Sequence, residues 1–178
     1  MNFSERPIII TDFETTGLDS RTQDIIEIGA FKVDQKNLVV SGFFDTKVHI
    51  QHPNTISHEA LAVNGYTKDS WGDAVFLPHA IQNFSKFAAD GVLASWNITF
   101  EYDFLAEAFR RVGLANPMDY HRIDIPSIAW FKFSPINKIS QDAIGALLGL
   151  PEEIKPHRAL QGAHYALDIL RKLRGFNV

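Results

Sequence analysis

The chain has 178 residues, of which 46% are hydrophobic and 21% charged, a composition typical of one globular domain with a sizeable core. The formal charge of −4 excludes a protein that coats duplex nucleic acid with an overall basic surface. The absence of cysteine excludes disulfides, thiolate zinc sites and cysteine nucleophiles. No signal peptide and no run of about 20 apolar residues is visible, so we expect a cytoplasmic protein with no membrane partner.

The first third of the sequence predicts three strands. Residues 7–12 form a short apolar run, which is typical of a strand that is buried on both faces. Residues 24–33 and 38–48 predict two further strands, and the polar residues 34–37 between them are typical of a hairpin turn. We therefore expect the sheet to begin with antiparallel strands.

The rest of the sequence predicts helices with two short strands among them. A short helix begins after Ser57, whose side chain is a favourable N-cap. Apolar residues at helical spacing predict longer helices, and two short apolar runs predict strands. The expected helices cover 79–89, 100–112, 125–133, 140–148 and 159–174, and the expected strands 91–96 and 122–124. We therefore expect a single α/β domain over residues 1–178, with a mixed central sheet flanked by helices.

The motif TDFETTGL near the N-terminus is the segment that most suggests chemistry. Asp12 and Glu14 are two residues apart at the end of a strand, so both side chains leave the same face. Adjacent carboxylates raise each other's pKa unless a cation lies between them, and hard oxygen ligands favour Mg²⁺ or Mn²⁺. Thr15, Thr16 and Gly17 then turn the chain, and we expect their backbone amides to be exposed to a phosphate or a ribose. The alternative is a strand end whose carboxylates are merely solvated.

Three motifs, in this order along the chain, resemble those of the DEDDh (DnaQ-like) exonuclease family. DFETTGL, with IIEIGA in the strand after it, resembles the first motif. NITFEYDFL, which begins at Asn97, resembles the second, and HRALQGA, which begins at His157, resembles the third. Between them, residues 56–67 resemble the family's loop and short helix, with Asn64 where a histidine is usual. The resemblance covers nearly the whole chain, and it implies the ribonuclease H-like fold and a 3′-5′ exonuclease activity.

The resemblance also implies a role for each matching acidic residue and for the histidine. Asp12, Glu14 and Glu101 would be ligands of one or two Mg²⁺ or Mn²⁺ ions, which activate a water and stabilise the leaving oxygen. His157 would accept the proton of the attacking water, since histidine titrates near neutrality. These roles require the four side chains to converge around a place where a cation can bind.

The remaining matching residues would bind the substrate. Thr16 and Leu18 would hold the terminal nucleotide, the leucine by apolar contact with the base. Asn97 and Phe100 would shape the site, with Phe100 beside the terminal base. The implied partner is the 3′ end of single-stranded DNA or RNA. Some members of the family are dimers, so a homodimer or another protein partner stays open.

Two positions depart from the family's pattern. Glu101 stands where the second motif has aspartate, and it keeps the charge with one more methylene. Gly162, five residues after His157, stands where the third motif has aspartate, and it has no side chain. Neither Asp103 nor Asp168 replaces these groups, because helical geometry turns both side chains away from the required directions.

Three carboxylates where the family has four leave two functions open. The first is a metal-dependent exonuclease of reduced or altered activity, because Asp12, Glu14 and His157 are all present. The second is a catalytically silent relative that binds nucleic-acid ends or a protein partner, because Gly162 removes a ligand.

Basic residues gather at the ends of two predicted helices. Arg110 and Arg111 close one of them, and residues 171–174 close the last. Both groups are typical of solvated helix ends that favour the helix dipole. Contact with a nucleic-acid backbone is the alternative.

Overall fold

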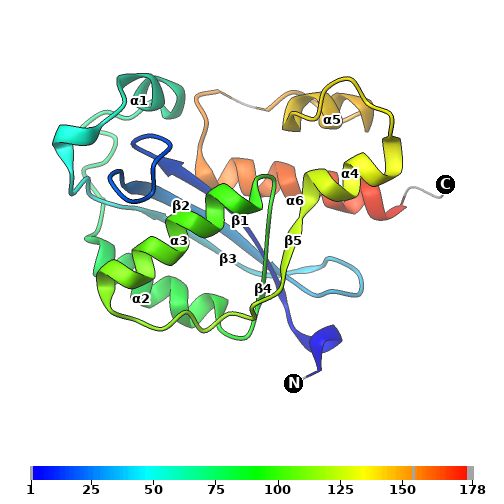
Figure 1. Ribbon diagram of the computed structural model, residues 1–178, viewed down its shortest axis with the longest axis horizontal. Helices are drawn as coiled ribbons and strands as arrows, with labels where there is room; N and C mark the ends of the chain where they lie inside the picture. The colour runs from blue at the N-terminus through cyan, green and yellow to red at the C-terminus, as the bar shows by residue number, and fades with distance from the viewer. Residues whose placement is uncertain (1, 154, 176–178) are drawn as a thin grey trace.

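The computed structural model describes residues 2–153 and 155–175, which contain a five-stranded mixed sheet with helices on both faces (Figure 1). The strands are β1 Ile8–Thr15, β2 Ile25–Val33, β3 Val40–Lys47, β4 Val92–Ser95 and β5 Arg122–Asp124, in the order β3-β2-β1-β4-β5. β2 is antiparallel to both of its neighbours, whereas β4 is parallel to β1 and β5. The predicted α/β fold with a mixed sheet is confirmed. Residues 1, 154 and 176–178 of the predicted domain lie outside the described residues.

The helices form a layer on each side of the sheet. They are α1 His58–Asn64, α2 Leu77–Ala88, α3 Ile98–Val112, α4 Ile125–Phe133, α5 Gln141–Leu147 and α6 Ala159–Gly175, with short 3-10 turns at Phe3–Glu5 and Pro53–Thr55. Ile9 belongs to the core under α2 and α3, and Ile10 to the core under α4, α5 and α6. Successive strand residues point to opposite faces, so the apolar run of β1 fills both cores. In the described part of the chain, no helix is both long and apolar enough for a bilayer crossing.

Two boundaries near the predicted site differ from the prediction. β1 runs three residues further, to Thr15, because Asp12 and Glu14 stay paired with β2, opposite Gly29 and Glu27. α3 begins two residues earlier than predicted, since Asn97 is its N-cap and accepts a hydrogen bond from a backbone amide of the first turn. The two carboxylates of β1 therefore lie within the paired strand and not beyond its end.

The start of α6 is held tightly against β2. A Cβ atom on Gly29 would lie 2.2 Å from backbone atoms at the beginning of α6, so only glycine allows this approach. Two residues earlier, the buried Glu27 accepts hydrogen bonds from the Arg158 guanidinium at 2.5 and 3.2 Å and from the first amide of α6 at 3.4 Å. These contacts fix the position of His157, the residue before Arg158, relative to the sheet.

Candidate active site

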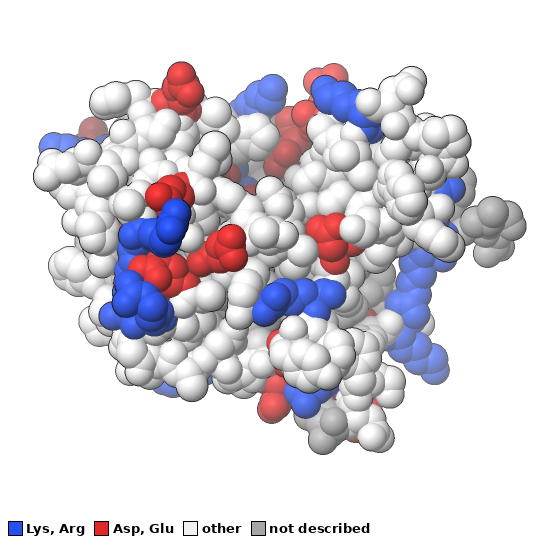
Figure 2. All heavy atoms as spheres, viewed as in Figure 1, with Lys and Arg blue, Asp and Glu red and all other residues white. Residues whose placement is uncertain are grey.

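One pocket of about 220 Å³ brings together six of the ten predicted site residues. It lies where the end of β1 meets α1, α5 and the first turn of α3 (Figure 1), and acidic atoms are visible in the hollow between the α1 and α5 sides of the molecule (Figure 2). The predicted residues that line it are Asp12, Glu14, Asn97, Phe100, Glu101 and His157. Phe13, Val63, Trp96 and Gln141 also line it and were not predicted.

The two carboxyl groups of β1 lie in surroundings that disfavour their charged forms. Burial, and then the charge of Glu14, raises the pKa of Asp12 well above its ordinary value. Burial, and then the charge of Glu27, raises the pKa of Glu14 to about 8, and the nearby Arg158 opposes this shift only in part. Without a cation, the Glu14 carboxyl therefore keeps its proton at neutral pH.

Glu101 reaches the same pocket from α3. The residue is 3% exposed, and its Oε2 atom has no hydrogen-bond partner among the described residues. Burial, and then the charge of Asp12, raises the pKa of this carboxyl well above its ordinary value. A buried oxygen without a donor is costly to the fold, and hard carboxylate oxygens are the ligands that divalent cations prefer.

These donors fit a divalent cation in type, but they do not surround one point. Among residues 2–153 and 155–175, no group of three or more His, Asp or Glu side chains is close enough to form a complete metal site. The structure therefore places the four predicted side chains in one pocket, but it does not bring three of them together around a single point. Asp12, Glu14 and Glu101 are the residues that would hold the ion.

Asp12 occupies the space above Gly162, where the family's fourth carboxylate is expected. A Cβ atom on Gly162 would lie 2.4 Å from Oδ2 of Asp12 and 2.7 Å from its Cγ. The two alternative acids lie elsewhere, because Asp103 and Asp168 line other cavities. The prediction that Asp103 and Asp168 do not replace the missing groups is thus confirmed. Gly162 leaves room for the Asp12 carboxylate of the first motif, where the family has a fourth carboxylate of its own.

His157 lies at the edge of the pocket and is partly exposed. Its Nδ1 is 3.5 Å from Oε2 of Glu153, and its backbone amide donates to the carbonyl of Val63 in α1 at 3.2 Å. Burial raises the pKa of Glu153, and the charge of His157 acts against this shift. The histidine is therefore oriented from two sides, by the carboxylate and by α1.

Leu18 is exposed in the loop after β1, whereas the three residues before it, Thr15, Thr16 and Gly17, are buried. The amide of the buried Thr16 donates to the carbonyl of Asp24 at 2.9 Å, and its hydroxyl accepts from the Asp24 amide at 2.9 Å. The Thr15 hydroxyl donates to the carbonyl of Gly17 at 2.6 Å. The expectation of a free amide at Thr16 is wrong, because the loop uses these groups to close its own turn. Leu18 is 86% exposed.

Leu18 lines a second hollow, of about 480 Å³, which shares Phe100 with the acidic pocket. The loop after β1 forms one wall and α3 forms the other. Its lining residues are Leu18, Asp19, Ser20 and Arg21 from the loop, and Phe100, Asp103, Phe104, Ala106, Glu107 and Arg110 from α3. The hollow carries both signs of charge, and Figure 2 shows acidic and basic side chains mixed over the α3 side of the molecule.

Arg111 is not the solvated helix end that the sequence predicts. Its side chain is 15% exposed and forms ion pairs with Asp24 and Glu107. Arg110 is 72% exposed and pairs with Glu107, as is typical of a solvated helix end. The prediction is therefore wrong for Arg111, because a neighbouring loop covers this face of α3.

Comparison with known proteins places these features in one family. A sequence model described as "Exonuclease" (RNase_T) matches residues 9–170. The DNA polymerase III PolC-type protein of Thermotoga maritima is 29% identical over 169 residues, and that of Streptococcus pneumoniae is 32% identical over 129 residues. These matches cover 94% and 72% of this chain but only 12% and 8% of the two relatives. The chain thus spans a small fraction of the curated relatives it matches.

Solved structures share the fold at low sequence identity. The nuclease domain of 3'hExo, a DEDDh family member bound to rAMP, has a TM-score of 0.80 at 17% identity and covers 98% of this chain and 94% of that one. E. coli exonuclease I in complex with a dA16 oligonucleotide has a TM-score of 0.81 at 13% identity and covers 96% of this chain and 41% of that one.

Proposed function

The chain belongs to the exonuclease family, and we propose that it is a metal-dependent 3′-5′ exonuclease of the DEDDh type, acting on single-stranded ends. The observation that carries this proposal is the shared pocket of Asp12, Glu14, Glu101 and His157. A structural domain without a ligand would have no use for three carboxyl groups that share one pocket and whose charged forms the protein disfavours.

Three carboxylates would hold the metal. Asp12, Glu14 and Glu101 would bind Mg²⁺ or Mn²⁺, which supplies Lewis-acid polarisation of a phosphate and lowers the pKa of a bound water. Two divalent ions carry four positive charges, of which these residues offset three. One ion would therefore bind to the free protein, and a second only together with the phosphate of the substrate. The loss of a fourth carboxylate at Gly162 points to reduced activity.

The other residues would position the reacting groups. His157 would accept a proton from the attacking water, with its ring held by Glu153 at 3.5 Å. Leu18 and Phe100, on opposite walls of one hollow, would hold the terminal base between them. Thr15, Thr16 and Gly17 would act indirectly, by shaping the loop that presents Leu18. Asn97 would act as the N-cap that places Glu101 in the first turn of α3.

The names of the relatives support nucleic acid without deciding between DNA and RNA. PolC-type DNA polymerase favours DNA, whereas structural neighbours were solved with rAMP and with dA16. The activity assay therefore includes both DNA and RNA substrates.

The direct test is metal-dependent release of nucleotides from DNA and RNA oligomers labelled at the 5′ end. We expect stepwise shortening from the 3′ end with Mg²⁺ or Mn²⁺, no shortening with chelator, and none in Asp12→Asn. An oligomer blocked at its 3′ end controls for direction. Absence of metal-dependent release at every protein concentration would end the proposal.

A silent relative that binds nucleic-acid ends or a protein partner is the second candidate. It is favoured by Gly162 and by the incomplete convergence of the carboxylates. Oligonucleotide binding without turnover would support it, as would gain of activity in Gly162→Asp.

A further inference from the structure

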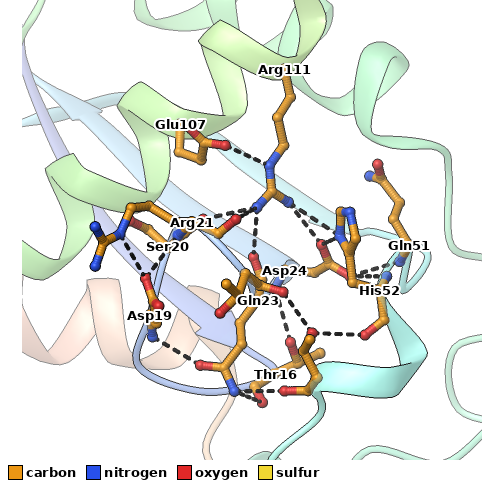
Figure 3. A network of polar contacts seen from close by, with 12 residues as sticks. Thr16, Asp19, Ser20, Arg21, Gln23, Asp24, Gln51, His52, Glu107 and Arg111 are labelled. Carbon is orange, nitrogen blue, oxygen red and sulfur yellow. Dashed lines mark hydrogen bonds and ion pairs between the residues drawn. The ribbon is translucent and has the colours of Figure 1, made fainter.

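Arg111 lies outside the acidic pocket, yet its guanidinium joins α3 to the loop after β1 (Figure 3). Nε donates to Glu107 on the same helix at 2.9 Å, and Nη1 donates to Asp24 at 2.9 Å. Nη2 donates to three carbonyl groups of the loop region, those of Ser20 at 2.9 Å, Arg21 at 3.1 Å and Gln23 at 3.3 Å. All three nitrogens of the guanidinium are therefore used, and each points to a different partner.

Asp24 extends this cross-link to a third segment. Its side chain is 2% exposed, and Oδ2 accepts the backbone amides of Gln51 and His52, both at 2.7 Å. Oδ1 accepts the Arg111 guanidinium and contacts Nδ1 of His52 at 2.7 Å. Two backbone amides and the Arg111 guanidinium thus donate to one buried carboxylate, and Arg111 neutralises its charge.

This network determines how the loop lies relative to α3. The loop carries Leu18, and α3 carries Phe100 about three turns before Arg111. The two apolar side chains line opposite walls of the same hollow. A shift of the carbonyls at residues 20–23 away from α3 would widen that hollow.

We propose that Arg111 is a positioning residue for the substrate, because it sets the separation between Leu18 and Phe100 and thereby the fit of the terminal nucleotide. The inference rests on the proposed function, which supplies the occupant of the hollow. Lysine is no substitute, since one ammonium nitrogen does not reach two carboxylates and three carbonyls that lie in different directions.

The test compares Arg111→Gln with Arg171→Gln. Arg171 of α6 also ties a helix to a loop, by donating to the carbonyl of Leu38 at 2.8 and 3.3 Å, and it lines neither the acidic pocket nor the hollow. For Arg111→Gln we expect a KM for single-stranded oligonucleotide raised about tenfold, with kcat changed by less than about twofold. Hydrogen exchange of the amides in residues 17–23 should be faster. Arg171→Gln should change neither quantity.

The conservative variant separates geometry from charge. Arg111→Lys keeps the positive charge beside Asp24. If Arg111→Gln does not fold, Arg111→Lys is compared with Arg171→Gln in its place. We expect it to show the raised KM and the faster loop exchange of Arg111→Gln. A wild-type KM and wild-type loop exchange in Arg111→Lys would overturn the proposal, and so would a KM that rises equally in Arg171→Gln.

Failure of the proposed function can be distinguished from failure of the positioning role of Arg111. It would appear as a wild-type protein that neither binds nor shortens an oligonucleotide. The exchange experiment needs no substrate, so it still decides whether Arg111 orders the loop. Unchanged exchange of residues 17–23 in Arg111→Gln would overturn the positioning role in either case.

Discussion

The two buried acidic regions of this molecule differ in how their charge is compensated. Asp24 and Glu101 are equally buried, at 2% and 3% exposure. Asp24 accepts hydrogen bonds from two backbone amides and the Arg111 guanidinium, whereas Oε2 of Glu101 has no donor in the described part of the chain. Burial raises the pKa of Asp12, Glu14 and Glu101, and among the described residues none of the three forms an ion pair with a basic side chain. The fold thus neutralises the carboxylate that supports its own loops but not the three in the acidic pocket, as the proposed cation site requires.

The largest expected effect comes from replacing a carboxylate of the acidic pocket, whose charge no basic side chain in the described residues compensates. Asp12→Asn should lower nuclease activity by at least about 100-fold, since a metal ligand contributes several kcal/mol to the transition state. The same variant should raise the metal-free stability by about 1 kcal/mol, because it removes a buried repulsion. Nucleotide release and urea unfolding without metal measure the two effects. A variant that loses activity and stability together would contradict the comparison.

The compensated side should respond in the opposite way. Asp24→Asn leaves the Arg111 guanidinium beside a neutral group and weakens its contacts with two loops, so we expect a loss of about 3 kcal/mol in the free energy of unfolding. Urea titration at neutral pH gives this value directly. A loss smaller than about 1 kcal/mol would mean that the network contributes little to the fold.

The pH dependence of stability should reveal the uncompensated charge. The pKa of Glu14 is raised from 4.5 to about 8 in the folded protein, so the folded state binds the proton more tightly than the unfolded state. This contribution is fully present below pH 4.5 and is lost as the pH rises through about 8. Metal-free stability should therefore fall over this window by about 1 to 2 kcal/mol, and less so in Glu14→Gln. Thermal unfolding of the wild type and of Glu14→Gln between pH 4.5 and about 8 measures how stability changes with pH.

The smallest effect is expected at the glycine of the third motif. A Cβ atom in Gly162→Ala must displace the Asp12 carboxylate, so Mn²⁺ affinity should fall about threefold to tenfold. Greater helix propensity should offset part of the strain, by up to about 1 kcal/mol. Gly175→Ala in the same helix is the control, because a Cβ there meets nothing within 4 Å. Unchanged Mn²⁺ affinity by titration calorimetry would show that Gly162 does not support the position of Asp12.

The sequence predicted most of the fold because its signals there are local. The apolar run of β1, the helical spacing of α3 and the N-cap residues are each readable within a few positions. The same holds for Asp12 and Glu14, whose spacing on one strand places them on one face. Their extension into the paired sheet was missed, since pairing with β2 does not depend on local propensity.

The remaining features depend on contacts between distant segments. From the sequence, Arg111 is predicted to lie at a solvated helix end. Its burial and its ion pair with Asp24 become visible only when the neighbouring loop is in place. The resemblance to the third motif implied that Gly162 stands in place of an aspartate, but not that Asp12 fills the space above it. Trp96 and Gln141 line the pocket without belonging to any chemical motif, so no local signal marked them.

The central claim is that Asp12, Glu14 and Glu101 form a cation site that the fold itself leaves uncompensated. The most direct test is thermal unfolding at pH 7.5, with and without saturating Mn²⁺, of the wild type and of Asp12→Asn. The account predicts that Mn²⁺ raises the Tm of the wild type and leaves that of Asp12→Asn almost unchanged. A wild type that Mn²⁺ does not stabilise, or an equal rise in Asp12→Asn, would contradict it.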